Sequence, residues 1–374
     1  LLSRSHQLYK GLNMNPYEQL PTQSFWKAVI HATPPHAVQF DCGKKFTFPP
    51  TAAFVTAGSC FAQHFAKKLA ERGGNVLIAE QRHPLTAENS AHGYNIFSAR
   101  YGNIYTTRQL LEILQQAFAI RPTIYDFGTR DDGRWVDMLR PRAVPMGFSS
   151  EEQGRADRDF HLAMVRKLIS EMDVLVFTLG LTETWVNSEQ NYCYPVVPGA
   201  IAGEFIESKH TFKNLNFNEV TEDLRAILQI IASHNIDTKV ILTVSPVGLV
   251  ATVEQRNVLV STSASKSILR AAADEIVREF THVDYFPSFE IITSPYTQGN
   301  FWAEGLRDVT EKGVDCVMGI FFDSRMPDFH QQTISPQQPT IINPSIENAL
   351  EKAITEECDE MFLDPSLRSR KRDQ

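Results

Sequence analysis

Residues 54–62 place a serine hydroxyl where nucleophilic chemistry is favoured. The stretch begins as the apolar run Phe-Val-Thr-Ala and then takes helical spacing, with Phe61, Phe65 and Leu69 at four-residue intervals. Ser59 therefore falls at a predicted strand-to-helix turn, where free backbone N–H groups and the positive end of the helix dipole point. A nucleophilic hydroxyl there has anion-stabilising donors beside it. An ordinary N-cap serine would also suit this position, so the local pattern leaves both interpretations open.

The composition is typical of a globular protein that does not bind nucleic acid. The chain has 374 residues, of which 43% are hydrophobic and 21% charged, so it can bury a substantial core. Its formal net charge is −8, and the single basic run at 368–372 is typical of a solvated tail. The first residues lack the apolar core of a signal peptide, and no run reaches transmembrane length.

The cysteines give no sign of a disulfide framework or a metal centre. There are five, widely spaced and without a CxxC pair. We therefore expect a reduced, cytoplasmic protein without a metal or a cofactor.

Short apolar runs alternate with segments of helical periodicity along most of the chain. The runs predicted to be strands are 54–57, 75–79, 173–180, 239–245 and 283–286. Predicted helices follow the first run, start after Thr106 (which has capping-box spacing to Gln109), and cover about 157–171, 218–234, 257–280, 310–322 and 345–361. This alternation predicts an α/β fold whose mainly parallel sheet carries helices on both faces.

One α/β domain with two extensions fits the chain better than two domains, because no linker of flexible composition divides it. Residues 1–50 are rich in proline and contain Tyr17, Phe25, Trp26 and Phe40, which predicts an arm anchored on the domain by aromatic side chains. Residues 51–322 form the predicted α/β domain, and 323–374 form a C-terminal extension.

Ligands of open parallel sheets bind beyond the carboxyl ends of the strands. The loops expected there are 58–60, 180–185, 245–249 and 287–290, and the loop at 101–103 could reach the same edge. Serine, asparagine and glutamate side chains would then share one neighbourhood.

The residues at 58–62, Gly-Ser-Cys-Phe-Ala, are the motif that gives the GSCFA family its name. The chain resembles this family from about residue 15 to residue 322, including the blocks at 100–106, 178–183, 245–247 and 286–288. GSCFA proteins in turn resemble the SGNH/GDSL hydrolases, a group of esterases and acyltransferases. The resemblance implies a three-layer α/β/α fold with a mainly parallel five-stranded sheet, of the flavodoxin-like SGNH-hydrolase type.

The SGNH resemblance also implies roles for particular residues. Ser59 would attack an ester. The Ser59 backbone N–H, together with Gly102 or Asn103, would stabilise the oxyanion. Thr182 and Glu183 stand where the family's asparagine-bearing block belongs. A hydroxyl can replace an amide as a donor, whereas a carboxylate cannot unless it is protonated.

The expected catalytic base is missing from its place. The Asp-x-x-His block aligns with residues 305–308, where Gly305 replaces the aspartate and Asp308 the histidine. A general base needs a pKa near 7, which histidine has and an exposed aspartate lacks. Either another group acts as base, or the chain does not run the usual triad chemistry.

Several other groups could act near Ser59. His64 lies one turn into the following helix, and Glu183 or Asp308 could serve if burial raised its pKa. The remaining candidates are His92, the Asp328–His330 pair, the Cys60 thiol, and the aromatics Trp185, Tyr101 and Tyr105, which could line a pocket. Solvation is the more common state for the Asp328–His330 pair, and packing is the more common role for Cys60 and the aromatics.

The sequence favours a serine-dependent ester hydrolase or O-acyltransferase that acts on a carbohydrate or another small ester. The alternative is a binding or scaffold protein on a hydrolase-like fold, as the residues at 305 and 308 suggest. A metal-dependent hydrolase ranks third, because no histidine–carboxylate cluster has ligand spacing.

Overall fold

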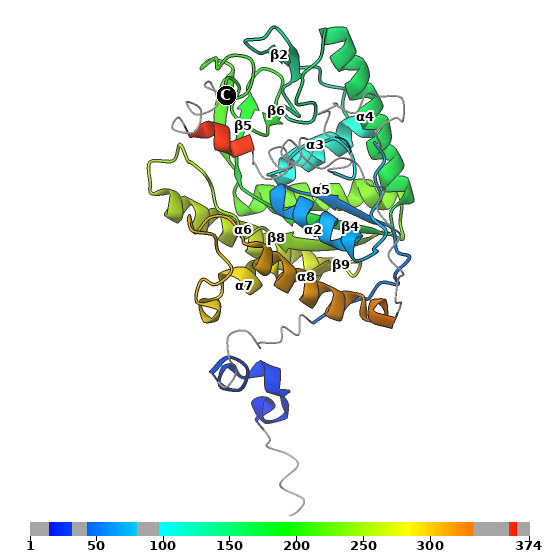
Figure 1. The fold of residues 1–374 in the computed structure, drawn as a ribbon, viewed down its shortest axis with the longest axis vertical. Coiled ribbons are helices and arrows are strands. Elements are labelled where there is room, and N and C mark those ends of the chain that lie inside the picture. The colour runs from blue at the N-terminus through cyan, green and yellow to red at the C-terminus, as the bar shows by residue number, and fades with distance from the viewer. Residues whose placement is uncertain (1–14, 32–42, 81–93, 95–96, 332–358, 365–374) are drawn as a thin grey trace, which may run out of the picture.

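A four-stranded parallel sheet forms the centre of the protein, seen in a computed structural model that describes residues 15–31, 43–80, 94, 97–331 and 359–364 (Figure 1). The strand order is β1-β4-β8-β9. These strands comprise β1 (Phe54–Ala57), β4 (Val174–Leu179), β8 (Lys239–Val244) and β9 (Val283–Tyr285). All neighbouring pairs are parallel, which confirms the predicted α/β class.

The predicted strand at 75–79 is wrong as a strand. Val76 forms only an isolated parallel bridge with Phe54, and the Leu77 N–H donates to the Phe54 carbonyl at 2.8 Å. Beyond this point Ser98 takes over the outer edge of β1, since its hydroxyl accepts from the Thr56 N–H at 3.1 Å. The edge segment does not continue its ladder along β1, and the described sheet has four strands instead of five.

Helices cover both faces of the sheet, as alternate strand residues require. Val174 and Val176 pack in a cluster with side chains of α2 (Cys60–Glu71), α7 (Ser288–Thr293) and α8 (Glu311–Arg325). Leu175 and Phe177 pack on the opposite side. The helices there are α3 (Thr107–Ala117), α4 (Glu151–Glu171), α5 (Phe217–His234) and α6 (Val258–Glu279). The result is three layers, α/β/α.

The predicted helix boundaries agree with the observed ones to within a few residues, except that α4 begins at Glu151 instead of 157. The sequence does not predict the short helix α7, since a loop is expected at 287–290. The predicted capping box is present, because the Thr106 side chain accepts from the Gln109 N–H and the Gln109 side chain accepts from the Thr106 N–H. The apolar face Phe61, Phe65 and Leu69 of α2 is buried.

A second sheet follows β4, in a part of the chain where the sequence predicts no strand. Its order is β6-β5-β7, with β5 (Glu183–Asn187) paired antiparallel to both β6 (Tyr192–Tyr194) and β7 (His210–Asn214). A two-stranded hairpin, β2 (Phe127–Thr129) and β3 (Trp135–Asp137), lies earlier in the chain. Because β5 begins four residues after the end of β4, this sheet borders the carboxyl edge of the central one.

The described parts of the two extensions are short helical turns. At the N-terminal end these are η1 (Pro16–Gln19), η2 (Thr22–Ser24) and η3 (Lys27–His31), in a segment where Tyr17, Phe25 and Trp26 are exposed. Phe48 is the buried aromatic of this part, and its N–H donates to the Arg325 carbonyl at 2.7 Å.

The C-terminal extension is described at η6 (Pro327–Gln331) and η7 (Asp359–Leu363), and η5 (Pro295–Thr297) precedes α8. The predicted helix at 345–361 lies mostly outside the described residues. In the described part of the chain, no helix is long and apolar enough to cross a membrane.

Candidate active site

The β1–α2 junction requires glycine at its first position. Gly58 has φ +144°, and a Cβ placed on it would lie 2.8 Å from both the Cβ and the carbonyl oxygen of Thr178 in β4. Any larger residue would push the two neighbouring strands apart at their carboxyl ends. Gly58 thus sets Ser59 at the end of β1, directly before the first turn of α2.

Ser59 occupies the N-cap position of α2 without acting as a cap through its side chain. Its backbone is extended and its carbonyl accepts from the Ala62 N–H at 2.9 Å, but its hydroxyl makes no capping hydrogen bond. To the described residues the hydroxyl makes no other hydrogen bond, and only 4% of the residue is exposed. The N-cap interpretation is therefore wrong for the side chain, and the hydroxyl remains available for chemistry.

The loop at 100–104 lies against this junction. The Ile104 N–H donates to the Gly58 carbonyl at 2.9 Å, and the Gln63 amide nitrogen donates to the Asn103 side-chain oxygen at 3.0 Å. Gly102 has φ +70°, and the space where its Cβ would stand is open. Ser59, Gly102 and Asn103 are thus brought together, as the sequence predicts for neighbouring loops.

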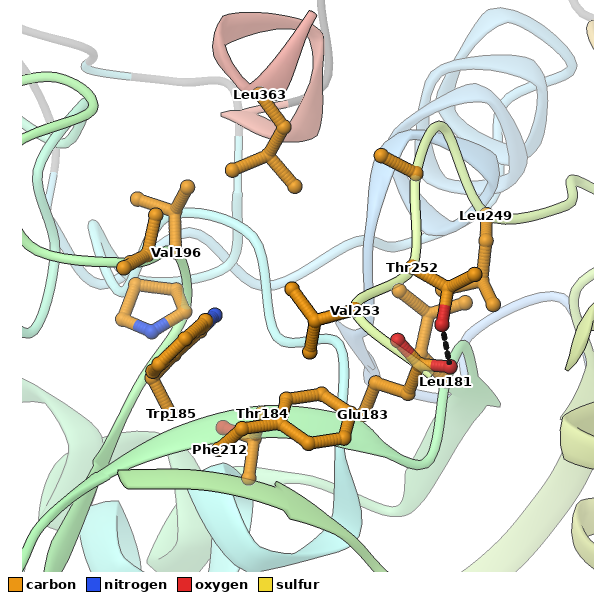
Figure 2. A pocket seen from close by; sticks show the side chains of 13 residues that line it. Leu181, Glu183, Thr184, Trp185, Val196, Phe212, Leu249, Thr252, Val253 and Leu363 are labelled. Carbon is orange, nitrogen blue, oxygen red and sulfur yellow. Dashed lines mark hydrogen bonds between the residues drawn. The ribbon is translucent and has the colours of Figure 1, made fainter. Parts of the chain in front are cut away.

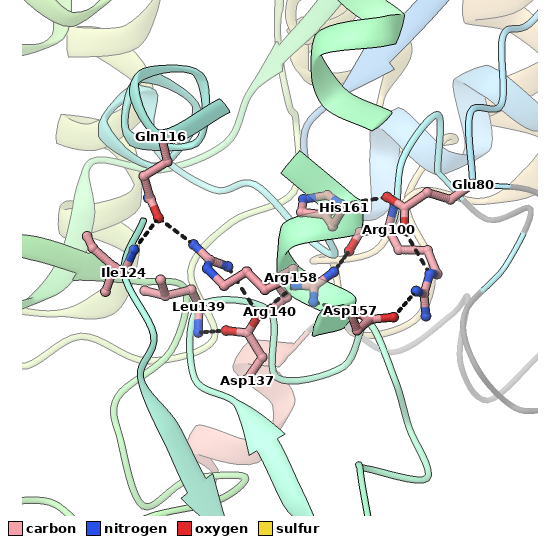
Figure 3. Close-up of polar contacts among 10 residues, drawn as sticks. All are labelled: Glu80, Arg100, Gln116, Ile124, Asp137, Leu139, Arg140, Asp157, Arg158 and His161. Carbon is pink, nitrogen blue, oxygen red and sulfur yellow. Dashed lines mark hydrogen bonds and ion pairs between the residues drawn. The ribbon is translucent and has the colours of Figure 1, made fainter. Parts of the chain in front are cut away.

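A buried ionic cluster holds the 100–104 loop in place (Figure 3). The Glu80 carboxylate accepts from the Arg100 backbone N–H at 2.8 Å and from its Nε at 3.0 Å, and it contacts His161 Nδ1 of α4 at 2.5 Å. Burial alone would raise the pKa of Glu80, but the charges and hydrogen bonds of His161, Arg140 and Arg100 outweigh it and lower the pKa to about 2. Burial also lowers the pKa of His161, against the pull of Glu80.

The same cluster continues towards β3. Arg140 joins Asp137 to Asp157, with both contacts at 2.7 Å, and donates to the Arg100 carbonyl at 3.3 Å. Arg158 donates to Asp137 at 3.1 Å. Because the partners come from distant parts of the chain, no sequence pattern indicates this cluster beyond a concentration of arginines.

Thr182 and Glu183 follow β4 but lie in different surroundings. Thr182 is fully buried, with its N–H donated to the Ser265 hydroxyl at 3.0 Å. Glu183 is half-buried and accepts from the Thr252 hydroxyl at 2.8 Å. Burial raises the pKa of Glu183, and the neighbouring Glu254 adds to the effect.

His64 and Asp308 line one cavity of about 470 Å³, together with Cys60 and Val247. The Asp308 side chain is 66% exposed and lies 3.1 Å from Arg307. In the described residues, no histidine makes a hydrogen bond to Ser59. The structure thus brings an imidazole and a carboxylate to a cavity that is lined by Cys60, the residue after the serine, and in the described residues these groups form no triad with Ser59.

A second, apolar cavity of about 250 Å³ lies beyond Glu183 (Figure 2). Trp185 of β5 and Phe212 of β7 form one wall, and Leu249 and Val253 face them. Trp185 therefore lines a pocket, whereas Tyr101 is buried and donates its hydroxyl to the Thr56 carbonyl.

The remaining sequence candidates contribute little to this region. His92 lies outside the described residues, and Asp328 is exposed within η6, where the His330 side chain is not described. Across the described ranges, no group of three or more His, Cys, Asp or Glu residues is arranged to hold a metal ion.

Comparison with solved structures gives weak matches. A Streptococcus pneumonia protein described as a candidate platelet activating factor is 10% identical, with 85% of this chain and 97% of that one covered at a TM-score of 0.34. A carbohydrate esterase of family 3 from Talaromyces cellulolyticus is 9% identical over 76% of this chain and 100% of its own, at a TM-score of 0.35. An acetyl esterase with an acetate ion is 9% identical, with 75% of this chain and 99% of that one covered at a TM-score of 0.34.

Family membership rests instead on the sequence. No curated protein matches the chain. The GSCFA family matches residues 53–321, a span that contains β1, the Ser59 junction, the central sheet and most of α8. The chain belongs to the GSCFA family.

Proposed function

We propose that this protein is a serine-dependent ester hydrolase or O-acyltransferase of the SGNH/GDSL-like type, acting on a carbohydrate or another small ester. The observation that carries the proposal is the Ser59 hydroxyl, which stands at the N-terminus of a 12-residue helix without capping it. The helix dipole and the free N–H groups of that first turn favour negative charge beside it.

In the proposed reaction the Ser59 oxygen attacks the ester carbonyl and gives up its proton to a base. The oxyanion forms within reach of the Ser59 and Gly102 N–H groups, which make no hydrogen bond to the described residues, and of the Asn103 amide. The ester alcohol then leaves with a proton, and an acyl-serine remains. Water, or an acceptor hydroxyl, removes the acyl group and restores the serine.

We assign the role of base to His64. It shares the 470 Å³ cavity with Cys60, the neighbour of Ser59, and histidine is the side chain whose ordinary pKa suits proton transfer near neutral pH. Asp308 lines the same cavity but is paired with Arg307, and Glu183 is engaged with Thr252 in the other cavity.

The strand arrangement supports the SGNH-type fold within this proposal. When the Val76 bridge is counted as the position of an outer strand, the spatial order becomes 75–79, β1, β4, β8, β9. This is the flavodoxin-like order, in which ligands bind at the carboxyl edge next to the first strand. Ser59 and the 100–104 loop lie at that edge.

Labelling with a fluorophosphonate probe tests the proposal directly. The probe is expected to form one adduct on Ser59 in the wild-type protein and none in Ser59→Ala. Ser188→Ala, at an exposed serine, is the matched control and should label as the wild type does. His64→Gln should slow labelling at least tenfold if His64 is the base. Absence of an adduct on Ser59 in a folded wild-type protein would refute the proposal.

The second candidate is a binding or scaffold protein on the same fold. It is favoured by one observation, that Gly305 and Asp308 replace the Asp-x-x-His pair while Asp308 is turned to Arg307 and solvent. It predicts that wild type and Ser59→Ala are equally inactive across a panel of acetyl and acyl esters while both remain folded.

A further inference from the structure

The walls of the apolar cavity come from separate parts of the chain. Trp185 and Phe212 are directly paired across β5 and β7, so their rings stand on the same face of the second sheet. The loop after β8 supplies Leu249 and Val253, and η7 supplies Leu363. Figure 2 shows these side chains converging on one space, with Glu183 and Thr252 bonded to each other at its side.

The loop after β8 runs from the neighbourhood of Ser59 to this cavity. Val247 packs against Cys60, the residue after the serine. Two residues further on, Leu249 packs against Leu181 and Tyr105 and lines the cavity. A molecule whose reacting group lies at Ser59 could therefore extend along this loop into the cavity.

The chain's own C-terminal turn already lies along that path. Met361 packs on the Cys60–Val247 cluster, and its sulfur lies 3.9 Å from Arg307 Nη1. Leu363, two residues later, points towards the apolar cavity (Figure 2). Two flexible, uncharged side chains of η7 thus stand at the two ends of the route.

We propose that the apolar cavity is the acyl subsite of this protein, which binds the aliphatic chain of an ester whose carbonyl lies at Ser59, and that η7 is its built-in competitor. The proposal rests on the proposed function and names its substrate class. Leu363 indicates which ligand the cavity binds, because this aliphatic side chain of the protein itself already lines the cavity.

The size and polarity of the cavity agree with this occupant. A cavity of about 150 Å³ accepts benzene, and drug-sized ligands need about 300 Å³ or more, so 250 Å³ suits a short acyl chain. Its carboxyl group, Glu183, is already hydrogen-bonded to Thr252. Burial raises the pKa of Glu183 above its ordinary value.

The test measures binding of methyl acetate, butyrate and hexanoate to the Ser59→Ala protein by ligand-observed NMR, so that no turnover is needed. Affinity should rise about fourfold for each added methylene that enters the cavity. Val253→Trp, which fills the cavity from a residue that is 56% exposed, should weaken hexanoate binding at least tenfold. Val260→Trp, equally exposed at 53% on α6 but outside the cavity, should change nothing.

The competitor is tested with Leu363→Ala, which should tighten hexanoate binding several-fold. A flat chain-length series, or equal effects of Val253→Trp and Val260→Trp, would overturn the acyl subsite. Weaker binding by Leu363→Ala would overturn the competition by η7. These outcomes are independent of Ser59 labelling, so hexanoate binding without a fluorophosphonate adduct would reject the proposed reaction and keep the subsite.

Discussion

Replacing Glu80 by glutamine should destabilise the protein by about 3 kcal/mol at pH 7. The carboxylate is fully buried and its pKa is lowered from the ordinary 4.5 to about 2. The difference between the unfolded and folded pKa corresponds to about 3 kcal/mol of stability when the group is ionised. Removal of one partner from a buried ion pair costs a similar amount, about 3–5 kcal/mol, because Arg100 would then face an amide instead of a charge.

The pH dependence gives the sharper test, since the pKa is lowered in the folded state. The contribution of Glu80 is fully present above the unfolded pKa of 4.5 and is lost as the pH falls towards 2. Urea unfolding of wild type and Glu80→Gln should therefore differ by about 3 kcal/mol at pH 7 and by about 2 kcal/mol near pH 3.5. Asp132→Asn, at an exposed carboxylate paired with Arg130, is the control and should have little effect.

Glu80→Gln should also lower the reactivity of Ser59, although Glu80 does not contact Ser59. Glu80 holds the Arg100 backbone, so its replacement should loosen the 100–104 loop and slow fluorophosphonate labelling of Ser59 in the fraction that remains folded. A Glu80→Gln protein within 1 kcal/mol of wild type, or a difference that does not change with pH, would refute this account of the cluster.

Two further predictions concern glycines and a buried acid. Gly58→Ala should lower the melting temperature far more than Gly102→Ala. A Cβ at Gly58 would lie 2.8 Å from Thr178, whereas a Cβ at Gly102 would enter open space. The cost at Gly102 is therefore that of the positive φ alone, about 1–2 kcal/mol. Burial raises the pKa of Glu112 to about 7, although the hydrogen bond from the Cys193 N–H acts to lower it. Since this folded pKa lies above the unfolded value of 4.5, ionisation of Glu112 lowers stability as the pH rises through 7. Glu112→Gln should therefore match or exceed wild-type stability in urea unfolding at pH 8, and a large loss there would contradict this.

The fold was predictable where a single segment carries its own signal. The runs at 174–179 and 239–244 are buried on both faces except at Lys239, so they are mostly apolar and their composition predicts central strands. The strands β5 to β7 have only three to five residues each and no clean alternation, because their faces meet a mixture of cavity, hairpin and solvent. The segment at 75–79 has the composition of a strand but forms no continuous ladder with β1. The Thr56 N–H of β1 donates instead to the Ser98 hydroxyl, which lies 42 residues further along the chain.

The candidate site was predictable to the same extent. Ser59, Gly102 and Asn103 come together because each lies at the same edge of the sheet, which the order of strands and helices already implies. The contacts that fix them could not be read from the chain, since Glu80 meets His161 across 81 residues and no local pattern links them. Asp308 stands where the family's catalytic histidine is expected, but only the structure shows that its side chain pairs with Arg307.

Four of the five residues at 58–62 serve the packing of the fold. Gly58 permits the close approach of β4, and Cys60, Phe61 and Ala62 are buried in the first turn of α2. Their packing roles do not depend on whether the protein reacts with esters. A chain identified by the motif is thus identified by its architecture, and its activity is decided by the groups that surround one hydroxyl.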